Sequence, residues 1–193
     1  RGFFPVEELS TLRKFGSRLQ GHPSMKCLPG IDMSTGSLGQ GISAAVGMAL
    51  AGKIDKKDYR VYTILGDGEL EEGQVWEASM CAAHYKLNNL TAFIDFNGLQ
   101  IDGDITKVMN PCPIDKKFEA FGWNVLVIDG HNYEEIIDAI EKAKECKDKP
   151  TAVVCKTIKG KGVSFMENQA EWHGIAPSRE QCEAALKELG GEN

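Results

Sequence analysis

Two oxygen-bearing side chains, Asp67 and Asn97, each follow a short apolar, strand-like segment. Each lies in a glycine-containing turn, Gly66-Asp67-Gly68 in one case and Asn97-Gly98 in the other. A carboxylate, an amide oxygen and a backbone carbonyl suit Mg²⁺ or Ca²⁺, and a substrate diphosphate can complete the coordination shell. Glycine at positions 66 and 68 lets the backbone approach such a diphosphate closely. The two turns therefore predict a divalent cation that holds a diphosphate.

A second candidate site for an anion is the segment 35–41, which has glycine at positions 36, 39 and 41 and leads into a helical pattern. The unpaired N–H groups and the dipole of a helix N-terminus attract phosphate groups. The same glycines also fit a simpler interpretation, an ordinary helix start that packs closely against a neighbour. The segment alone leaves both interpretations open.

Strand-like and helix-like patterns alternate along the chain and must position these turns. Strands are predicted at residues 60–65, 90–96, 123–128 and 151–157. Helices are predicted at residues 5–15, 37–52, 73–86 and 114–121. Two further helices are predicted, one that begins after an N-cap at Asn132 and one that begins with a capping box formed by Ser178 and Gln181. This alternation implies right-handed crossovers and an α/β fold of three layers, a doubly wound and mostly parallel sheet with helices on both faces.

The carboxyl ends of parallel strands meet at one edge of such a sheet, and ligands bind beyond that edge. The four predicted strands are followed by polar turns at residues 66–68, 97–98, 129–130 and 159–160. Turn geometry alone explains any one of them. Together they predict that Asp67 and Asn97 lie close in space. The stretch 160–177 shows no clear element and is interpreted as a long functional loop.

The composition of the chain argues against several classes of binding partner. The length of 193 residues suits one domain, residues 1–193, and the net charge of −6 argues against nucleic acid or an anionic membrane as a general partner. No apolar run reaches membrane-spanning length. The six cysteines form no C-x-x-C pair and most fall in helix or strand patterns. They are interpreted as reduced core thiols of a cytoplasmic protein.

Several segments resemble the transketolases, which are thiamine diphosphate-dependent enzymes. The turn at 66–68 followed by Asn97 is similar to the thiamine diphosphate signature, which pyruvate dehydrogenase, acetolactate synthase and deoxyxylulose phosphate synthase types also carry. The segments that resemble the transketolase form are residues 21–23, 35–41, 66–78, 159–162 and 172–174. The strongest resemblance is to the N-terminal, diphosphate-binding subunit of split bacterial transketolases.

The resemblance implies a thiamine diphosphate-binding fold and a cofactor held through Mg²⁺ or Ca²⁺. It implies metal ligands from the side chains of Asp67 and Asn97 and from the backbone carbonyl of Leu99. It implies that the cofactor is contacted by Gly36, Leu38, Asp67, Gly68, Asn97, Lys159 and His173. It also implies that His22 and His173 face the substrate as catalytic residues and that Glu72 belongs to a glutamate relay at the subunit interface. The neighbouring Glu69 and Glu71 are interpreted as acidic residues that favour a helix N-terminus.

The implied reaction transfers a two-carbon ketol unit from a ketose phosphate to an aldose phosphate, with the cofactor carrying the covalent chemistry. The implied partner is the C-terminal transketolase subunit, whose pyrimidine-binding domain supplies the glutamate that activates the cofactor. The isolated chain is therefore expected to be inactive. Two other functions stay open: a related enzyme such as dihydroxyacetone synthase or deoxyxylulose phosphate synthase, and a non-catalytic thiamine diphosphate-binding module.

The sequence departs from the family in one respect. The family's domain ordinarily begins with a further N-terminal segment that carries a His-Pro-Gly and a Gly-His-Ala motif, and neither motif occurs here. His84 and His131 lie in no motif that could replace them. A shortened piece, a proteolytic remainder and a natural minimal form all fit. Apolar surface that such a segment would cover, on helix 37–52 or near Phe3 and Phe4, is expected to promote self-association.

Overall fold

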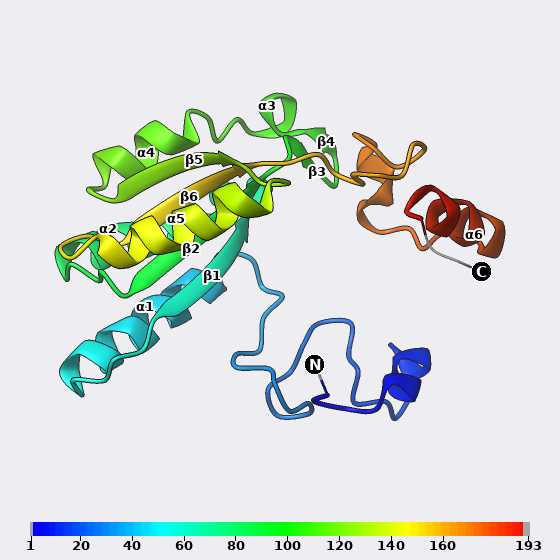
Figure 1. The fold of residues 1–193 in the computed structure, drawn as a ribbon, viewed down its shortest axis with the longest axis horizontal. Coiled ribbons are helices and arrows are strands. Elements are labelled where there is room, and N and C mark those ends of the chain that lie inside the picture. Colours follow the sequence, from blue (N-terminus) through cyan, green and yellow to red (C-terminus); the bar gives the residue numbers. More distant parts are fainter. Residues whose placement is uncertain (1, 191–193) are drawn as a thin grey trace.

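A four-stranded parallel sheet forms the centre of the computed structural model, which describes residues 2–190 (Figure 1). Its strands, in the spatial order β1-β2-β6-β5, are β1 (Val61–Gly66), β2 (Leu90–Phe96), β6 (Thr151–Lys156) and β5 (Asn124–Asp129). Directly after β2, the strands β3 (Leu99–Gln100) and β4 (Gly103–Asp104) form a small antiparallel hairpin. The predicted α/β fold with a mostly parallel sheet is confirmed, and all four strands of the main sheet end at one edge.

Helices cover both faces of this sheet. One face carries α1 (Gln40–Ile54), α2 (Gly73–His84) and α4 (Ile114–Ala120), and the other carries α5 (Tyr133–Glu145). The strand period of two explains the division. Ala152 and Val154 of β6 join the core under the first three helices, whereas Val153 and Cys155 pack with Ala139 of α5. The predicted three layers are therefore present.

The remaining elements are short or lie outside these layers. They are η1 (Val6–Thr11), η2 (Gly68–Glu71), α3 (Ile105–Val108), η3 (Ala170–His173) and α6 (Arg179–Glu188). Figure 1 shows α6 beyond the β3–β4 hairpin, away from the main sheet. The caps predicted from sequence are confirmed. Asn132 accepts N–H groups of Glu134 and Glu135 at the start of α5, and Ser178 and Gln181 form a capping box at the start of α6.

Two helix predictions need correction. The helix predicted over residues 5–15 is wrong, because only the 3-10 helix η1 forms and Phe15 is fully exposed. Its apolar stripe has no facing element to bury it, so the periodicity has no packing partner. The helix predicted to begin at residue 37 begins at Gln40. Gly39 adopts a φ of 78°, a left-handed conformation that ends the preceding loop.

The cysteine prediction is partly wrong. All six cysteines are unpaired, but Cys155 alone is buried, while Cys27 and Cys182 are exposed and are not core thiols. Within residues 2–190, no helix combines the length and the apolar character needed to span a bilayer.

The aromatic centre of the larger core gives a stability test. Phe118 is fully buried, and its ring centroid lies 5.3 Å from that of Trp123 and 5.4 Å from that of Trp76. We expect Phe118→Ala to lower the free energy of unfolding in urea by about 3–5 kcal/mol, because it leaves a cavity under α4. Tyr133→Ala, at a position that is 81% exposed, should change it by less than about 0.5 kcal/mol. Equal effects of the two substitutions would contradict the placement of α4 in the core.

Candidate functional site

Asp67 joins the turns that follow β1 and β2. Its Oδ1 accepts the backbone N–H of Gly68 at 2.8 Å, and its Oδ2 accepts the backbone N–H of Gly98 at 2.6 Å. The second bond crosses from the exit of one strand to the exit of its parallel neighbour. The predicted proximity of Asp67 to the turn that contains Asn97 is therefore confirmed.

The carboxylate of Asp67 is buried, with 2% of the residue exposed. Burial raises the pKa of this carboxyl, the N–H groups of Gly98 and Gly68 lower it, and the nearby charge of Asp95 raises it further. None of the ion pairs among residues 2–190 includes Asp67. A buried carboxylate without a cationic partner is unfavourable. A divalent cation at this place would stabilise it.

Asn97 has a fixed amide orientation in the neighbouring turn. Its Oδ1 accepts the N–H of Leu99 at 3.0 Å, and its Nδ2 donates to Oδ2 of Asp95 at 3.3 Å. An amide oxygen has two lone pairs, so one stays available on Oδ1. Gly98 adopts a φ of 77°, which favours glycine at the point where the chain reverses. The residues predicted to bind metal thus gather on two joined turns, and their role as ligands stays a prediction.

The donor set decides which cation fits. In the part of the chain that the structure describes, no three His, Cys, Asp or Glu residues cluster to hold a metal. A structural zinc site, which needs such a cluster, does not fit. One carboxylate, one amide and one backbone carbonyl fit Mg²⁺ or Ca²⁺ if a diphosphate supplies further oxygens. The residues present therefore suit a metal that is bound together with a diphosphate.

Glu69 connects the segment before α1 to the end of β1 through two hydrogen bonds. Its Oε1 accepts the N–H of Gly39 at 2.9 Å, and its Oε2 accepts the N–H of Gly66 at 3.1 Å. The sequence interpretation of Glu69 as a general helix-start acid missed this contact. The unpaired N–H groups at the predicted helix start, that of Gly39 among them, were the available signal, but nothing local identified their acceptor.

His22 packs directly on Gly36. A Cβ atom on Gly36 would overlap the imidazole of His22, and the φ of 137° at Gly36 also favours glycine. Leu38, two residues on, is 57% exposed. Glu72 is exposed and lies beside the same segment, with its Cβ 2.9 Å from the position that a Cβ on Gly39 would take. These predicted site residues form a second group, along the segment that leads into α1.

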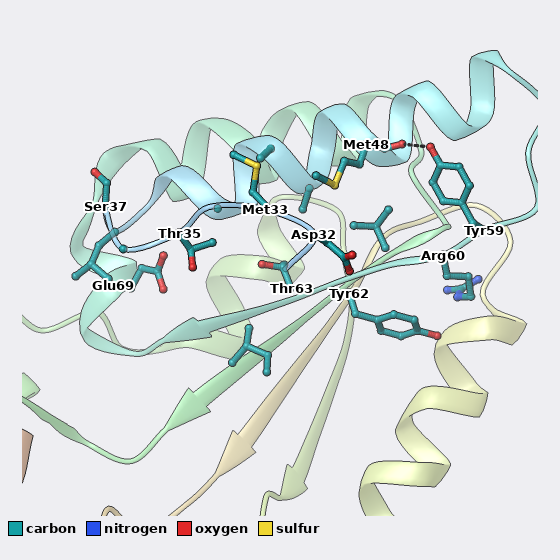
Figure 2. A pocket seen from close by; sticks show the side chains of 17 residues that line it. Asp32, Met33, Thr35, Ser37, Met48, Tyr59, Arg60, Tyr62, Thr63 and Glu69 are labelled. Atoms are coloured by element: carbon teal, nitrogen blue, oxygen red, sulfur yellow. Dashed lines mark hydrogen bonds between the residues drawn. The ribbon is translucent and has the colours of Figure 1, made fainter. Parts of the chain in front are cut away.

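A cavity of about 870 Å³ lies between α1, β1 and the segment 32–38 (Figure 2). Figure 2 shows Ser37 and Glu69 at one end, and at the other Tyr59, whose hydroxyl donates to the carbonyl of Met48 at 2.8 Å. The volume is large enough for a small organic ligand. Gly36 and Leu38 line it. The predicted residues that do not line it are Asp67, Gly68, Glu72, Asn97, Leu99, Lys159 and the two histidines predicted to be catalytic, His22 and His173.

Lys159 and His173 lie on the long segment that follows β6. The carbonyl of Lys159 accepts the N–H of Asn168 at 3.0 Å, which closes the first part of this segment into a loop. Farther on, η3 contacts both strands of the β3–β4 hairpin. The exposed His173 at the end of η3 is thereby placed near the hairpin that begins at Leu99. Within the described residues, no side-chain hydrogen bond joins Lys159 or His173 to Asp67 or Asn97.

Exposed apolar side chains lie on several parts of the chain, and within the helix predicted over residues 37–52 they include Leu38. The face of α1 toward the sheet is buried, whereas Tyr62 and Ile64 on the edge strand β1 are 45% and 76% exposed. Phe3 is also exposed, as predicted. These two side chains lie on the same side of the sheet as α5, at the edge strand β1, which α5 does not cover.

The Glu69 contact predicts local order before α1. Bonds from backbone N–H groups to a carboxylate are stronger than neutral ones. We therefore expect Glu69→Ala to speed amide hydrogen exchange at Gly39 by about 10- to 100-fold, with the exchange of β2 unchanged. Glu77→Ala, at an exposed position on α2, is the matched control. Unchanged exchange at Gly39 in Glu69→Ala would contradict the role given to Glu69.

Comparison with known proteins places these features in a family. The family described as "Transketolase, thiamine diphosphate binding domain" matches residues 2–193. The 6-deoxy-6-sulfo-D-fructose transketolase subunit SqwG of Clostridium sp. (strain MSTE9) is 50% identical over 193 residues, which are all of this chain and 70% of that protein. One subunit of the apulose-4-phosphate transketolase of Phocaeicola vulgatus is 46% identical over 98% of this chain and 67% of its own length.

Solved structures agree with this result. The transketolase of Campylobacter jejuni superposes with a TM-score of 0.91 at 36% identity, over 96% of this chain and 30% of that one. The matched part of that longer enzyme thus has the same fold as the sheet and helices described above. The chain belongs to the transketolase thiamine diphosphate-binding domain family.

Proposed function

We propose that this chain is the diphosphate- and metal-binding part of a transketolase built from two polypeptides. In this assembly it takes part in the transfer of a two-carbon ketol unit from a ketose to an aldose. The observation that carries the proposal is the buried carboxylate of Asp67, which has no cationic partner in the described chain and lies against the turn of Asn97. Family membership supports thiamine diphosphate as the ligand.

Each group of residues has a part in this function. Asp67, Asn97 and the carbonyl of Leu99 would hold Mg²⁺, which offsets the charge of the diphosphate. Gly68 lets the backbone approach the diphosphate, and Lys159 adds a positive charge from the segment after β6. Thiamine diphosphate, when bound, supplies the nucleophilic carbon that carries the transferred unit.

The second group acts on the organic part of the ligands. Gly36 and Leu38 line the cavity and would contact the thiamine. His22, held on Gly36, and His173, near the hairpin, would exchange hydrogen bonds or protons with the hydroxyl and carbonyl groups of a sugar.

The proposed partner is a C-terminal subunit with a pyrimidine-binding domain. The two relatives named above are called subunits, and this chain spans 30% of the solved transketolase chain, so most of that enzyme lies in other sequence. Glu72 is exposed beside the segment before α1, where it can meet such a partner. The exposed Tyr62 and Ile64 support self-association as a further contact. Six unpaired cysteines support a cytoplasmic location.

The donor is proposed to be an anionic ketose. One of the two relatives is named for a sulfonated fructose and the other for a ketose phosphate, so the charged group varies while the ketose is common. Sugar phosphates are the simplest members of this class. The sulfonated sugar of the first relative makes a sulfonate the second class to assay.

The metal assignment predicts a selective loss of binding. Asp67→Ala removes the charge that offsets the cation, so Mg²⁺-dependent affinity for thiamine diphosphate should fall by about 100-fold or more, beyond the 10- to 100-fold typical of outer-shell changes. Titration calorimetry measures this affinity. The circular dichroism of the ligand-free protein should not change. Asp58→Ala, at an exposed loop position, should bind like wild type. Full affinity in Asp67→Ala would exclude Asp67 as a ligand.

Turnover should require the partner. Each positioned acid–base group contributes about 10²–10⁴-fold, so the isolated chain, without the partner's glutamate, should show no measurable ketol transfer. The assay follows transfer from a xylulose phosphate to a ribose phosphate with Mg²⁺ and thiamine diphosphate, with and without the co-purified partner. Turnover by the isolated chain would contradict the two-chain proposal. Cofactor binding without turnover in either sample would identify a non-catalytic module instead.

A further inference from the structure

Asp95 touches two parts of the site although no motif singles it out. It is the sixth residue of the seven in β2, and its carboxylate is half-buried at the strand exit. Oδ2 accepts Nδ2 of Asn97 at 3.3 Å, and Oδ1 accepts the hydroxyl of Thr157. One side chain thus joins a predicted metal ligand to the first residue after β6.

The first contact selects one orientation of Asn97. An ionised carboxylate accepts hydrogen bonds and donates none, so Asp95 can face only the NH₂ side of the amide. The N–H of Leu99 is a donor, and it requires the oxygen on the other side. In a flipped amide, the Asn97 oxygen would face the carboxylate of Asp95 and its NH₂ would face the N–H of Leu99. Both contacts therefore direct Oδ1 toward the N–H of Leu99, in the turn of the predicted metal ligands.

The second contact reaches the segment that carries Lys159. The backbone N–H of Thr157 donates to the carbonyl of Phe96 at 3.1 Å, beside its hydroxyl bond to Asp95. On the other side, Nε2 of His131 accepts the N–H of Ile158 at 2.8 Å. The start of the segment is thus fixed from β2 by Asp95 and from the exit of β5 by His131.

We propose that Asp95 is a positioning residue that holds Asn97 with its oxygen toward the divalent cation and ties this turn to the Lys159 segment. The inference rests on the proposed function of the site, because the cation itself is part of that function. A different role would be purely electrostatic, in which the negative charge of Asp95 attracts the cation from a distance. The two roles differ in what they need, a hydrogen-bond acceptor in one case and a charge in the other.

Two substitutions at the same position separate these roles. Asp95→Asn removes the charge but keeps an acceptor for Asn97, with its own NH₂ free to donate to the hydroxyl of Thr157. Asp95→Ala removes both. Asp129→Asn is the charge control, because Asp129 lies at the exit of β5 and bonds to the N–H of His131 and not to Asn97. Affinity for Mg²⁺ with thiamine diphosphate is measured by titration calorimetry.

We expect Asp95→Ala to weaken this affinity by about 10- to 100-fold, as for other residues that orient a metal ligand. Asp95→Asn and Asp129→Asn should retain most of it. Wild-type affinity in Asp95→Ala would overturn the proposal. An equal loss in Asp95→Asn and Asp95→Ala would overturn it as well, in favour of the electrostatic role.

A second readout needs no cofactor. The side-chain NH₂ signals of Asn97, assigned by their loss in Asn97→Ala, are followed by nuclear magnetic resonance in the ligand-free protein. They should shift and exchange faster with water in Asp95→Ala and stay protected in Asp95→Asn. Unchanged signals in Asp95→Ala would overturn the orienting role. If wild type binds no thiamine diphosphate, the proposed function fails, and this readout still decides the role of Asp95.

Thr157 keeps the test decisive if Asp95→Ala does not fold. Thr157→Val removes the hydroxyl at nearly constant volume and should speed amide exchange at Ile158. Thr157→Ser keeps a hydroxyl at this position, so amide exchange at Ile158 should stay as slow as in wild type. No change at Ile158 in Thr157→Val would overturn the tie between the turn of Asn97 and the Lys159 segment.

Discussion

The hydrogen bond from the N–H of Gly98 to the buried carboxylate of Asp67 is the contact on which the site depends. It joins the exits of two neighbouring strands at the edge where ligands of doubly wound sheets bind. A bond from a backbone N–H to a carboxylate contributes about 1.5–3 kcal/mol. Without a cation, it must work against the desolvation of a charge that burial makes unfavourable. The same position is therefore electrostatically unfavourable in the free protein and suited to a metal.

The parallel sheet explains why the other residues arrive at this place. Strands that run in one direction bring Asp67, Asp95, Asp129 and Thr157 to a single edge, and side-chain and backbone bonds then connect neighbouring exits. Glu69 adds the segment before α1 to this network through Gly39. The site is consequently built from loops, but each loop is anchored to a rigid strand end.

What could be predicted from the sequence was what depends on local pattern. The strand at residues 90–96 and the caps at Asn132 and Ser178 were recovered because alternation and capping act within a few residues. The proximity of Asp67 and Asn97 followed from topology alone. The helix predicted over residues 5–15 failed because periodicity does not show whether a facing surface exists. The β3–β4 hairpin was not predicted, because a strand of two residues is too short to show an alternation of apolar and polar residues.

The roles of Glu69 and Asp95 could not be predicted, for a different reason. Glu69 bonds to a residue 30 positions away and Asp95 to one 62 positions away. An acid in a sequence is equally suited to a helix start, a solvated surface or a tertiary hydrogen bond, and only the packed structure selects among these. The site residues implied by the family resemblance could be named from the sequence, because each of them lies in a short local motif. The structure then sorts them into the two turns around Asp67, the segment around Gly36, and the long segment after β6 that carries Lys159 and His173.

Whether the two joined turns form a metal site completed by a diphosphate is tested most directly by anomalous X-ray scattering. Crystals of the protein are grown with Mn²⁺ and thiamine diphosphate, and the manganese is located by its own signal. We expect one peak within coordination distance, about 2.0–2.6 Å, of the side-chain oxygens of Asp67 and Asn97 and the carbonyl of Leu99. A manganese peak elsewhere in a crystal saturated with Mn²⁺ would contradict this assignment. Bound thiamine diphosphate with no manganese peak at these turns would contradict it as well.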